Sequence, residues 1–98
     1  MSPKYFIAQE MLNFKKEKVT GYYAQDRRSG GYPYFSEFIH NSEVRAFNTL
    51  DDAKQFLKEE YRIKDGKLGF NGYGQDNLIG FPRIVKLSFI TECIWEMT

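Results

Sequence analysis

Hydrophobic residues recur at three- and four-residue steps in one stretch near the middle of the chain. Between Thr49 and Tyr61 the apolar side chains fall on one stripe, and charged side chains occupy the opposite side. The stripe consists of Leu50, Ala53, Phe56, Leu57 and Tyr61. Thr49 followed by Asp52 has the form of a capping box, in which the hydroxyl accepts a hydrogen bond from the third amide of the helix. This pattern predicts an amphipathic helix that must bury its stripe against other elements.

Strand patterns precede this helix. Lys4 to Met11 is almost free of polar residues until Gln9, which predicts a strand that is buried on both faces, at or next to the centre of a sheet. Val19 to Gln25 is expected to be a second strand. It should run antiparallel to the first, because the charged and solvated turn between them, residues 13–18, is short. Gly21 is expected to mark a bulge in the second strand.

A glycine-rich turn and a third strand follow. Asp26 to Gly31 ends in Gly-Gly, which takes positive φ at low cost and so predicts a turn. Tyr32 to Ile39 is expected to be a strand, starting at Pro33 or lying on a sheet edge, because proline has no amide donor. After the helix, Leu68 to Gly80 is rich in glycine and predicts a long loop. Arg83 to Met97 alternates and predicts one long terminal strand, with a break near Thr91 as the alternative.

Together these elements predict a single α+β domain over residues 1–98. Their order is β-β-β-α-β, with the helix packed on one face of an antiparallel sheet. A chain of 98 residues is long enough for one core and too short for two. An unpaired edge of the terminal strand would allow pairing with a second copy, so a homodimer is compatible with the sequence.

Composition narrows the classes of function. The net charge of +1 excludes a strongly acidic nucleic-acid mimic and a histone-like binder, since each needs a large field of one sign. One cysteine cannot form an internal disulfide, which favours a reducing compartment. The longest apolar runs fall far short of the 18 or so residues of a membrane span. We therefore expect a cytoplasmic protein without a membrane partner.

Candidate catalytic residues are few. Cys93 lies on the expected core face of the terminal strand and is interpreted as a buried, inert thiol, while His40 is interpreted as a loop residue. Partners at zinc-ligand spacing are missing from the sequence. Gly69 to Gly74 looks like a phosphate-binding loop, but a strand pattern follows it where such loops open a helix. The sequence therefore predicts no catalytic residue, no metal and no cofactor.

Candidate contact residues gather around the glycine-rich turn. Arg27, Arg28, Tyr32 and Tyr34 place two guanidinium groups and two phenol rings in eight residues, and Tyr73 lies in the glycine-rich loop. Arginine and tyrosine are frequent hot spots of protein interfaces. The same side chains also suit single-stranded nucleic acid, through stacking and phosphate contacts. An ordinary hairpin tip with solvated arginines is the structural alternative.

The hairpin and helix together resemble small phage and prophage accessory proteins. Residues Gly31 to Phe35 provide the tyrosine-rich hairpin, and Phe47 to Leu57 follows the pattern aromatic-x-[ST]-Leu-[DE]-[DE]-Ala-Lys-x-Phe-Leu. The resemblance covers about a quarter of the chain, and its shared positions are structural, so it assigns no functional residue. Proteins of this class include anti-CRISPRs and other inhibitors of host enzymes.

We therefore expect a non-catalytic binding protein. The favoured function is a phage-type inhibitor or modulator of a host protein, such as a CRISPR effector or another defence enzyme. Its contact surfaces would be the hairpin from Arg27 to Tyr34 and the loop from Gly69 to Gly80. A small single-stranded nucleic-acid or RNA binder is the alternative, and a protein that sequesters a nucleotide signal in the glycine-rich loop is a third hypothesis.

Overall fold

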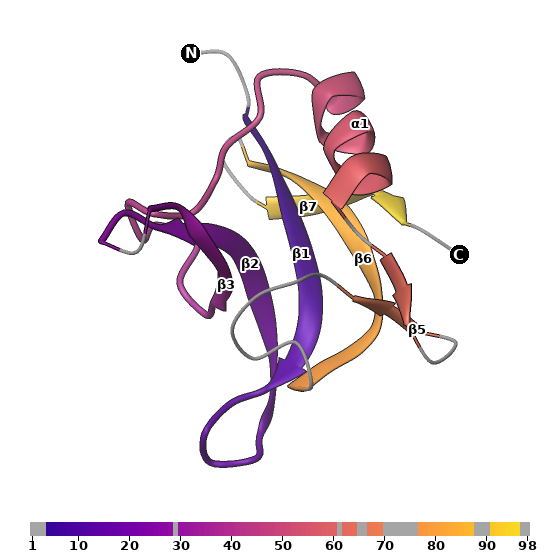
Figure 1. The fold of residues 1–98 in the computed structure, drawn as a ribbon. Helices are drawn as coiled ribbons and strands as arrows, with labels where there is room; N and C mark the ends of the chain where they lie inside the picture. The colour runs from indigo at the N-terminus through magenta and orange to yellow at the C-terminus, as the bar shows by residue number, and fades with distance from the viewer. Residues whose placement is uncertain are drawn as a thin grey trace.

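The computed structural model describes residues 4–28, 30–60, 62–64, 67–69, 77–87 and 91–96, and at residues 32, 60, 62–64, 67–69 and 91–93 it describes the backbone alone. The elements in chain order are β1 (Lys4–Leu12), β2 (Lys18–Asp26), β3 (Tyr32–Ser36), α1 (Leu50–Glu60), β4 (Arg62–Lys64), β5 (Lys67–Gly69), β6 (Leu78–Leu87) and β7 (Thr91–Glu96). Figure 1 shows α1 lying across one face of the large sheet. The predicted α+β class is confirmed.

The large sheet has the order β3-β2-β1-β6-β7, and all of its neighbouring strands are antiparallel. The short strands β4 and β5 form a separate two-stranded hairpin. β1 lies at the centre, as its uninterrupted apolar sequence predicts. β3, which contains Pro33, lies at one edge, in agreement with the missing amide donor of proline. β7 lies at the other edge, and pairing with a second copy stays a prediction.

Helix α1 begins where the capping pattern places it. The amide of Asp52 donates to the hydroxyl of Thr49 at 3.1 Å, which satisfies one of the free amides of the first turn. Ala53, Phe56 and Leu57 are buried, as the apolar stripe predicts. Tyr61, the last residue of the predicted stripe, lies outside the described residues. Within the described part of the chain, no helix is both long and apolar enough to cross a membrane.

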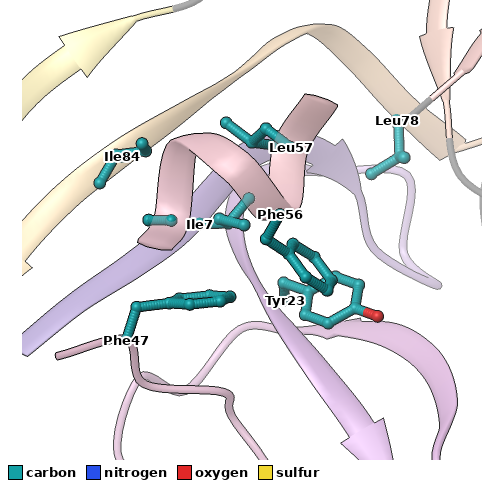
Figure 2. Packing of buried hydrophobic residues seen from close by; sticks show 8 residues of the cluster. Ile7, Tyr23, Phe47, Phe56, Leu57, Leu78 and Ile84 are labelled. Carbon is teal, nitrogen blue, oxygen red and sulfur yellow. The ribbon is translucent and has the colours of Figure 1, made fainter. Parts of the chain in front are cut away.

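Aromatic rings dominate the core between α1 and the sheet. Figure 2 shows Phe56 reaching from α1 toward Tyr23 of β2 and Phe47 of the segment before the helix, and Ile7, Ile84 and Leu57 belong to the same buried cluster. The rings of Tyr23 and Phe56 lie edge to face with centroids 4.8 Å apart, and those of Phe47 and Phe56 are 5.2 Å apart. Such pairs contribute about 0.5–1.5 kcal/mol each beyond the burial of their area.

The opposite face of the sheet carries a second, smaller cluster. Phe6, Ala8 and Val85 are buried there, and Ile39 and Val44 from the segment after β3 pack against them. Because α1 covers one face and this segment covers the other, the centre of β1 is shielded on both sides. Burial on both faces of the sheet therefore explains the apolar sequence of β1.

The segment that leads into α1 fills a gap between β1 and β2. These strands pair only from Ala8 opposite Tyr22 to Leu12 opposite Lys18. Beyond that point the segment pairs with both strands. Phe47 exchanges two backbone hydrogen bonds of 2.8 and 2.9 Å with Tyr5 of β1, and the amide of Arg45 donates to the carbonyl of Tyr23 of β2. Figure 1 shows the segment rising past β1 and β2 toward the helix.

Two strand predictions are corrected in detail. Gly21 does not mark a bulge, because the register of β2 on β1 is unbroken across it. A Cβ at this position would lie 2.7 Å from Sδ of Met11 and 3.0 Å from Cβ of Phe35, so close packing explains the glycine. The third strand ends at Ser36 and not at Ile39. The hydroxyl of Ser36 accepts the amide of Phe38 at 3.1 Å, and this local bond turns the chain away from β2.

The C-terminal prediction also changes. The alternative of a break near Thr91 is confirmed, because the expected terminal strand is two antiparallel strands: β6 ends at Leu87 and β7 begins at Thr91, with a register shift between Ile84 and Val85. β6 begins at Leu78, inside the segment predicted to be a loop. Residues 70–76 of that loop lie outside the described residues. In the pairing of β1 with β6, residues 80–82 of β6 lie opposite Gln9 alone, so the irregularity of this strand pair lies in β6.

Candidate protein-binding surface

Hydrogen bonds hold the described residues of the turn between β2 and β3. The amide of Gly31 donates to the carbonyl of Asp26 at 2.7 Å and closes the turn. The side chain of Asp26 accepts the amide of Arg28 at 2.8 Å. Gly30 and Gly31 have φ of 69° and 89°, which confirms the predicted use of positive φ. Arg27 and Arg28 are exposed on this turn.

Glu43 ties the turn to the segment after β3. One carboxylate oxygen accepts the backbone amide of Arg27 at 2.8 Å, and the other accepts the hydroxyl of Tyr34 at 2.5 Å. The carbonyl of Glu43 accepts the amide of Gln25 at 3.0 Å. A single residue therefore holds β2, β3 and the turn together through its side chain and its backbone.

Asn41 positions Glu43. Its side-chain oxygen accepts the amide of Glu43 at 2.9 Å, and its side-chain nitrogen donates to the hydroxyl of Tyr34 and to Oγ of Ser36, each at 3.3 Å. The guanidinium of Arg27 donates to the carbonyl of Ser42 at 3.0 Å. We call Arg27, Tyr34, Asn41, Ser42 and Glu43 the Glu43 cluster.

The ionisation of the cluster follows from these bonds. The hydroxyl of Tyr34 and the amide of Arg27 stabilise the carboxylate, so the pKa of Glu43 lies below its ordinary value. The pKa of Tyr34 is raised, first by its partial burial and then by its hydrogen bond to Glu43. Near neutral pH the pair is therefore a phenol donating to a carboxylate, and a bond of this length is usual for a charged acceptor.

Two open hollows lie beside Arg27. One, of about 460 Å³, is lined by residues that include Gln25, Val44 and Arg45. The other, of about 380 Å³, is lined by residues that include Asp26, Arg28 and Asn41. Arg27, Ser42 and Glu43 line both hollows, so the two hollows adjoin each other at these three residues of the cluster.

Exposed side chains surround the cluster. Phe38 is 72% exposed, and its carbonyl accepts the amide of Asn41 at 3.0 Å. Arg45 is exposed, and its guanidinium carbon lies 4.9 Å from the ring centroids of both Phe47 and Phe56. The surface thus combines guanidinium groups with one large apolar side chain, the mixture that protein interfaces favour.

The structure places the predicted contact residues unequally. Arg27, Arg28 and Tyr34 come together on the β2–β3 hairpin. The hydroxyl of Tyr34 is engaged inside the cluster and the residue is half-buried, so it supports the surface more than it extends from it. Tyr32 lies in β3, but its side chain is outside the described residues, and Tyr73 is outside them entirely.

Sequence reasoning missed Asn41, Glu43 and Phe38. The interpretation of the neighbouring His40 as a loop residue assigns no role to the residues beside it. Asn41 was recognisable in principle, because asparagine in a loop often accepts a backbone amide two residues later. The role of Glu43 depends on a strand nine residues earlier, and no local signal marks it.

Residues with metal-binding chemistry do not gather in the described part of the chain. His40 is exposed in the loop after β3, and the side chain of Cys93 in β7 lies outside the described residues. Groups of three or more His, Cys, Asp or Glu able to hold a metal ion are absent among the residues that were placed.

The Glu43 cluster and its exposed neighbours are therefore defined by this chain's own geometry. No protein-family model matches the sequence, and no curated protein and no solved structure is significantly similar to it.

Proposed function

We propose that the protein acts by stoichiometric binding to another protein, as a phage-type inhibitor or modulator of a host protein. A CRISPR effector or another defence enzyme is the class of target that the sequence resemblance suggests. The contact surface is the β2–β3 turn with the segment that follows β3. A fixed molar ratio between inhibitor and target is the property that separates this function from turnover.

The observation that carries the proposal is the preorganised turn. Glu43 binds the backbone of Arg27 and the hydroxyl of Tyr34, while Asp26 binds the amide of Arg28. Residues that such bonds already hold lose less conformational freedom on binding, so more of the contact energy becomes affinity. Arg27 and Arg28 can then reach a carboxylate of the partner in a defined geometry.

Phe38 supplies the apolar part of the contact. With 72% of its surface exposed, it gains little from the fold of its own chain. Buried in a pocket of a partner, an aromatic side chain is a typical anchor of an interface. The partner surface that fits is therefore an apolar pocket with acidic residues at its rim.

The test is affinity capture from nuclease-treated host lysate with the tagged protein. Four variants are compared with the wild type: Phe38→Ser and Arg28→Glu on the proposed surface, and Phe14→Ser and Lys58→Glu as controls of matched chemistry elsewhere. All four positions are exposed, so the fold should be retained, which circular dichroism checks.

A protein partner captured by the wild type and by both controls, and lost with Phe38→Ser and Arg28→Glu, supports the proposal. A partner that both surface variants retain, or that disappears on nuclease treatment, contradicts it. Titration of the purified partner with this protein should then saturate at a fixed molar ratio, and this protein should not turn the partner over.

A further inference from the structure

The connection between β1 and β2 presents an exposed aromatic ring among lysines. Phe14 is 87% exposed, compared with 72% for Phe38 and 50% for Phe81. Lys15, Lys16 and Lys18 follow it in the sequence and are themselves exposed. Figure 1 shows this connection extending beyond the body of the sheet, at the opposite end of β2 from the β2–β3 turn. We call residues 13–18 the basic tip.

The basic tip has a defined turn. The amide of Asn13 donates to the carbonyl of Glu17, and the amide of Lys16 donates to the carbonyl of Asn13, each at 2.9 Å. The side-chain oxygen of Asn13 also accepts the amides of Lys15 and Glu17, at 2.9 and 3.0 Å. Phe14 is therefore held away from the core by an ordered backbone.

Lys16 occupies a backbone position that normally belongs to glycine. Its φ is 64°, and it is the only non-glycine residue with positive φ in the part of the chain that the structure describes. A side chain in this region is strained, and glycine or asparagine would form the same turn at lower cost. A lysine at this position therefore lowers the stability of the turn, and such backbone strain often accompanies function.

The charge of the basic tip is positive. Glu17 is its single acid, and its carboxylate lies 3.5 Å from the side-chain nitrogen of Asn13. The ammonium of Lys15 lies 5.8 Å from the centroid of the Phe14 ring. An exposed aromatic ring with one ammonium group over it, and further lysines next to it in the chain, matches a base and the phosphates attached to it.

We propose that the basic tip binds single-stranded nucleic acid, with one base stacked on Phe14 and phosphates contacted by Lys15, Lys16 and Lys18. An anionic membrane shares the charge but fits less well, because even a myristoyl chain gives only marginal membrane binding, and one phenyl ring buries less apolar surface. A base gains about 5- to 150-fold in affinity from stacking on one ring. This site is separate from the surface around Glu43 and does not depend on the proposed function.

The test is fluorescence anisotropy with labelled oligo-dT and oligo-rU at several salt concentrations. For the wild type, three phosphate contacts predict a slope of log K against log salt of about −2, since single strands contribute about −0.7 per contact. Phe14→Ala should weaken binding by about 5- to 150-fold, and Phe14→Trp should retain it. Arg28→Glu, on the other surface, should leave the affinity within about twofold.

Lys16→Gly gives the sharpest readout. It removes one phosphate contact, so the slope of log K against log salt should become shallower, at about −1.4. It also relieves the backbone strain, so the temperature of unfolding should rise. A structural role for Lys16 alone would change neither slope nor affinity.

Two results would overturn the proposal. One is an affinity that is absent, or unchanged by Phe14→Ala. The other is Phe14-dependent binding to phosphatidylserine vesicles without binding to either oligonucleotide, which would assign the basic tip to a membrane. Because Phe14 is exposed, the variants should fold, and circular dichroism confirms this before each titration.

Discussion

The hydroxyl of Tyr34 donates to the carboxylate of Glu43 at 2.5 Å, and this bond joins β3 to the segment that returns across β2. The same carboxylate receives the amide of Arg27, so the turn, the edge strand and the returning segment share one acceptor group. The geometry of the proposed contact surface depends on that acceptor staying ionised.

Glu43 should make stability depend on pH in a predictable direction. Its pKa in the folded protein lies below the ordinary value of 4.5, so its contribution to the free energy of unfolding is present above that value. The contribution is lost as the pH falls through the lower, folded-state pKa. Urea unfolding of the wild type and of Glu43→Gln, from about pH 6 to about pH 2, measures it. The wild type should be more stable near pH 6, and the difference should shrink in acid; a difference independent of pH would contradict the prediction.

Gly21→Ala should destabilise the protein through contact alone. A Cβ there meets Sδ of Met11 at 2.7 Å and Cβ of Phe35 at 3.0 Å, and its φ lies outside the left-handed region. Overpacking of this kind costs about 1–3 kcal/mol. Urea unfolding should show that cost. In the Met11→Ala background the cost of Gly21→Ala should be smaller, because one of the two clashes disappears. If the losses in free energy of unfolding from the two substitutions simply added, the clash with Met11 would not explain the cost of Gly21→Ala.

Arg45 should stabilise the fold through the rings beneath it. Its guanidinium lies 4.9 Å from the centroids of Phe47 and Phe56, and it is exposed. Arg45→Met keeps the aliphatic stem and removes the charge, so we expect a loss of about 0.5–1 kcal/mol in the free energy of unfolding. Arg45→Lys should lose less, because an ammonium keeps the charge without the planar stacking. Lys54→Met, at 5.5 Å from the ring of Trp95, is the matched comparison and should cost no more than Arg45→Met.

Gly80 should be required for its backbone conformation. Its φ is 69°, and a Cβ would meet no atom within 4 Å, so substitution creates strain and no clash. Gly80→Ala should cost about 1–2 kcal/mol, and Gly80→Asn should cost less, since asparagine tolerates this region. The bond from the side chain of Gln9 to the carbonyl of Gly80 is available in both variants. Thermal unfolding of the two variants tests this explanation. Equal losses of stability in Gly80→Ala and Gly80→Asn would argue against it.

The candidate surface was only partly predictable. Arg27, Arg28 and Tyr34 are close in sequence, and a two-strand hairpin brings such residues together without help from the rest of the chain. Glu43, which organises them, contacts Tyr34 nine residues before it and Arg27 sixteen residues before it. A glutamate in a loop has many alternative partners, and a pattern of neighbours cannot choose among them.

The sequence by itself determined the elements that depend on near neighbours. These are the helix with its Thr49 cap, the central position of β1 and the positive φ of Gly30 and Gly31. Periodicity, capping and turn formation act within a few residues, so the local order of side chains is enough to specify them.

Only the tertiary structure decided where those elements separate and meet. The gap between β1 and β2 that the segment around Phe47 fills and the close approach of Gly21 to Phe35 both depend on distant residues. Such contacts are selected by how the whole core packs and by which buried backbone groups still need a hydrogen-bond partner.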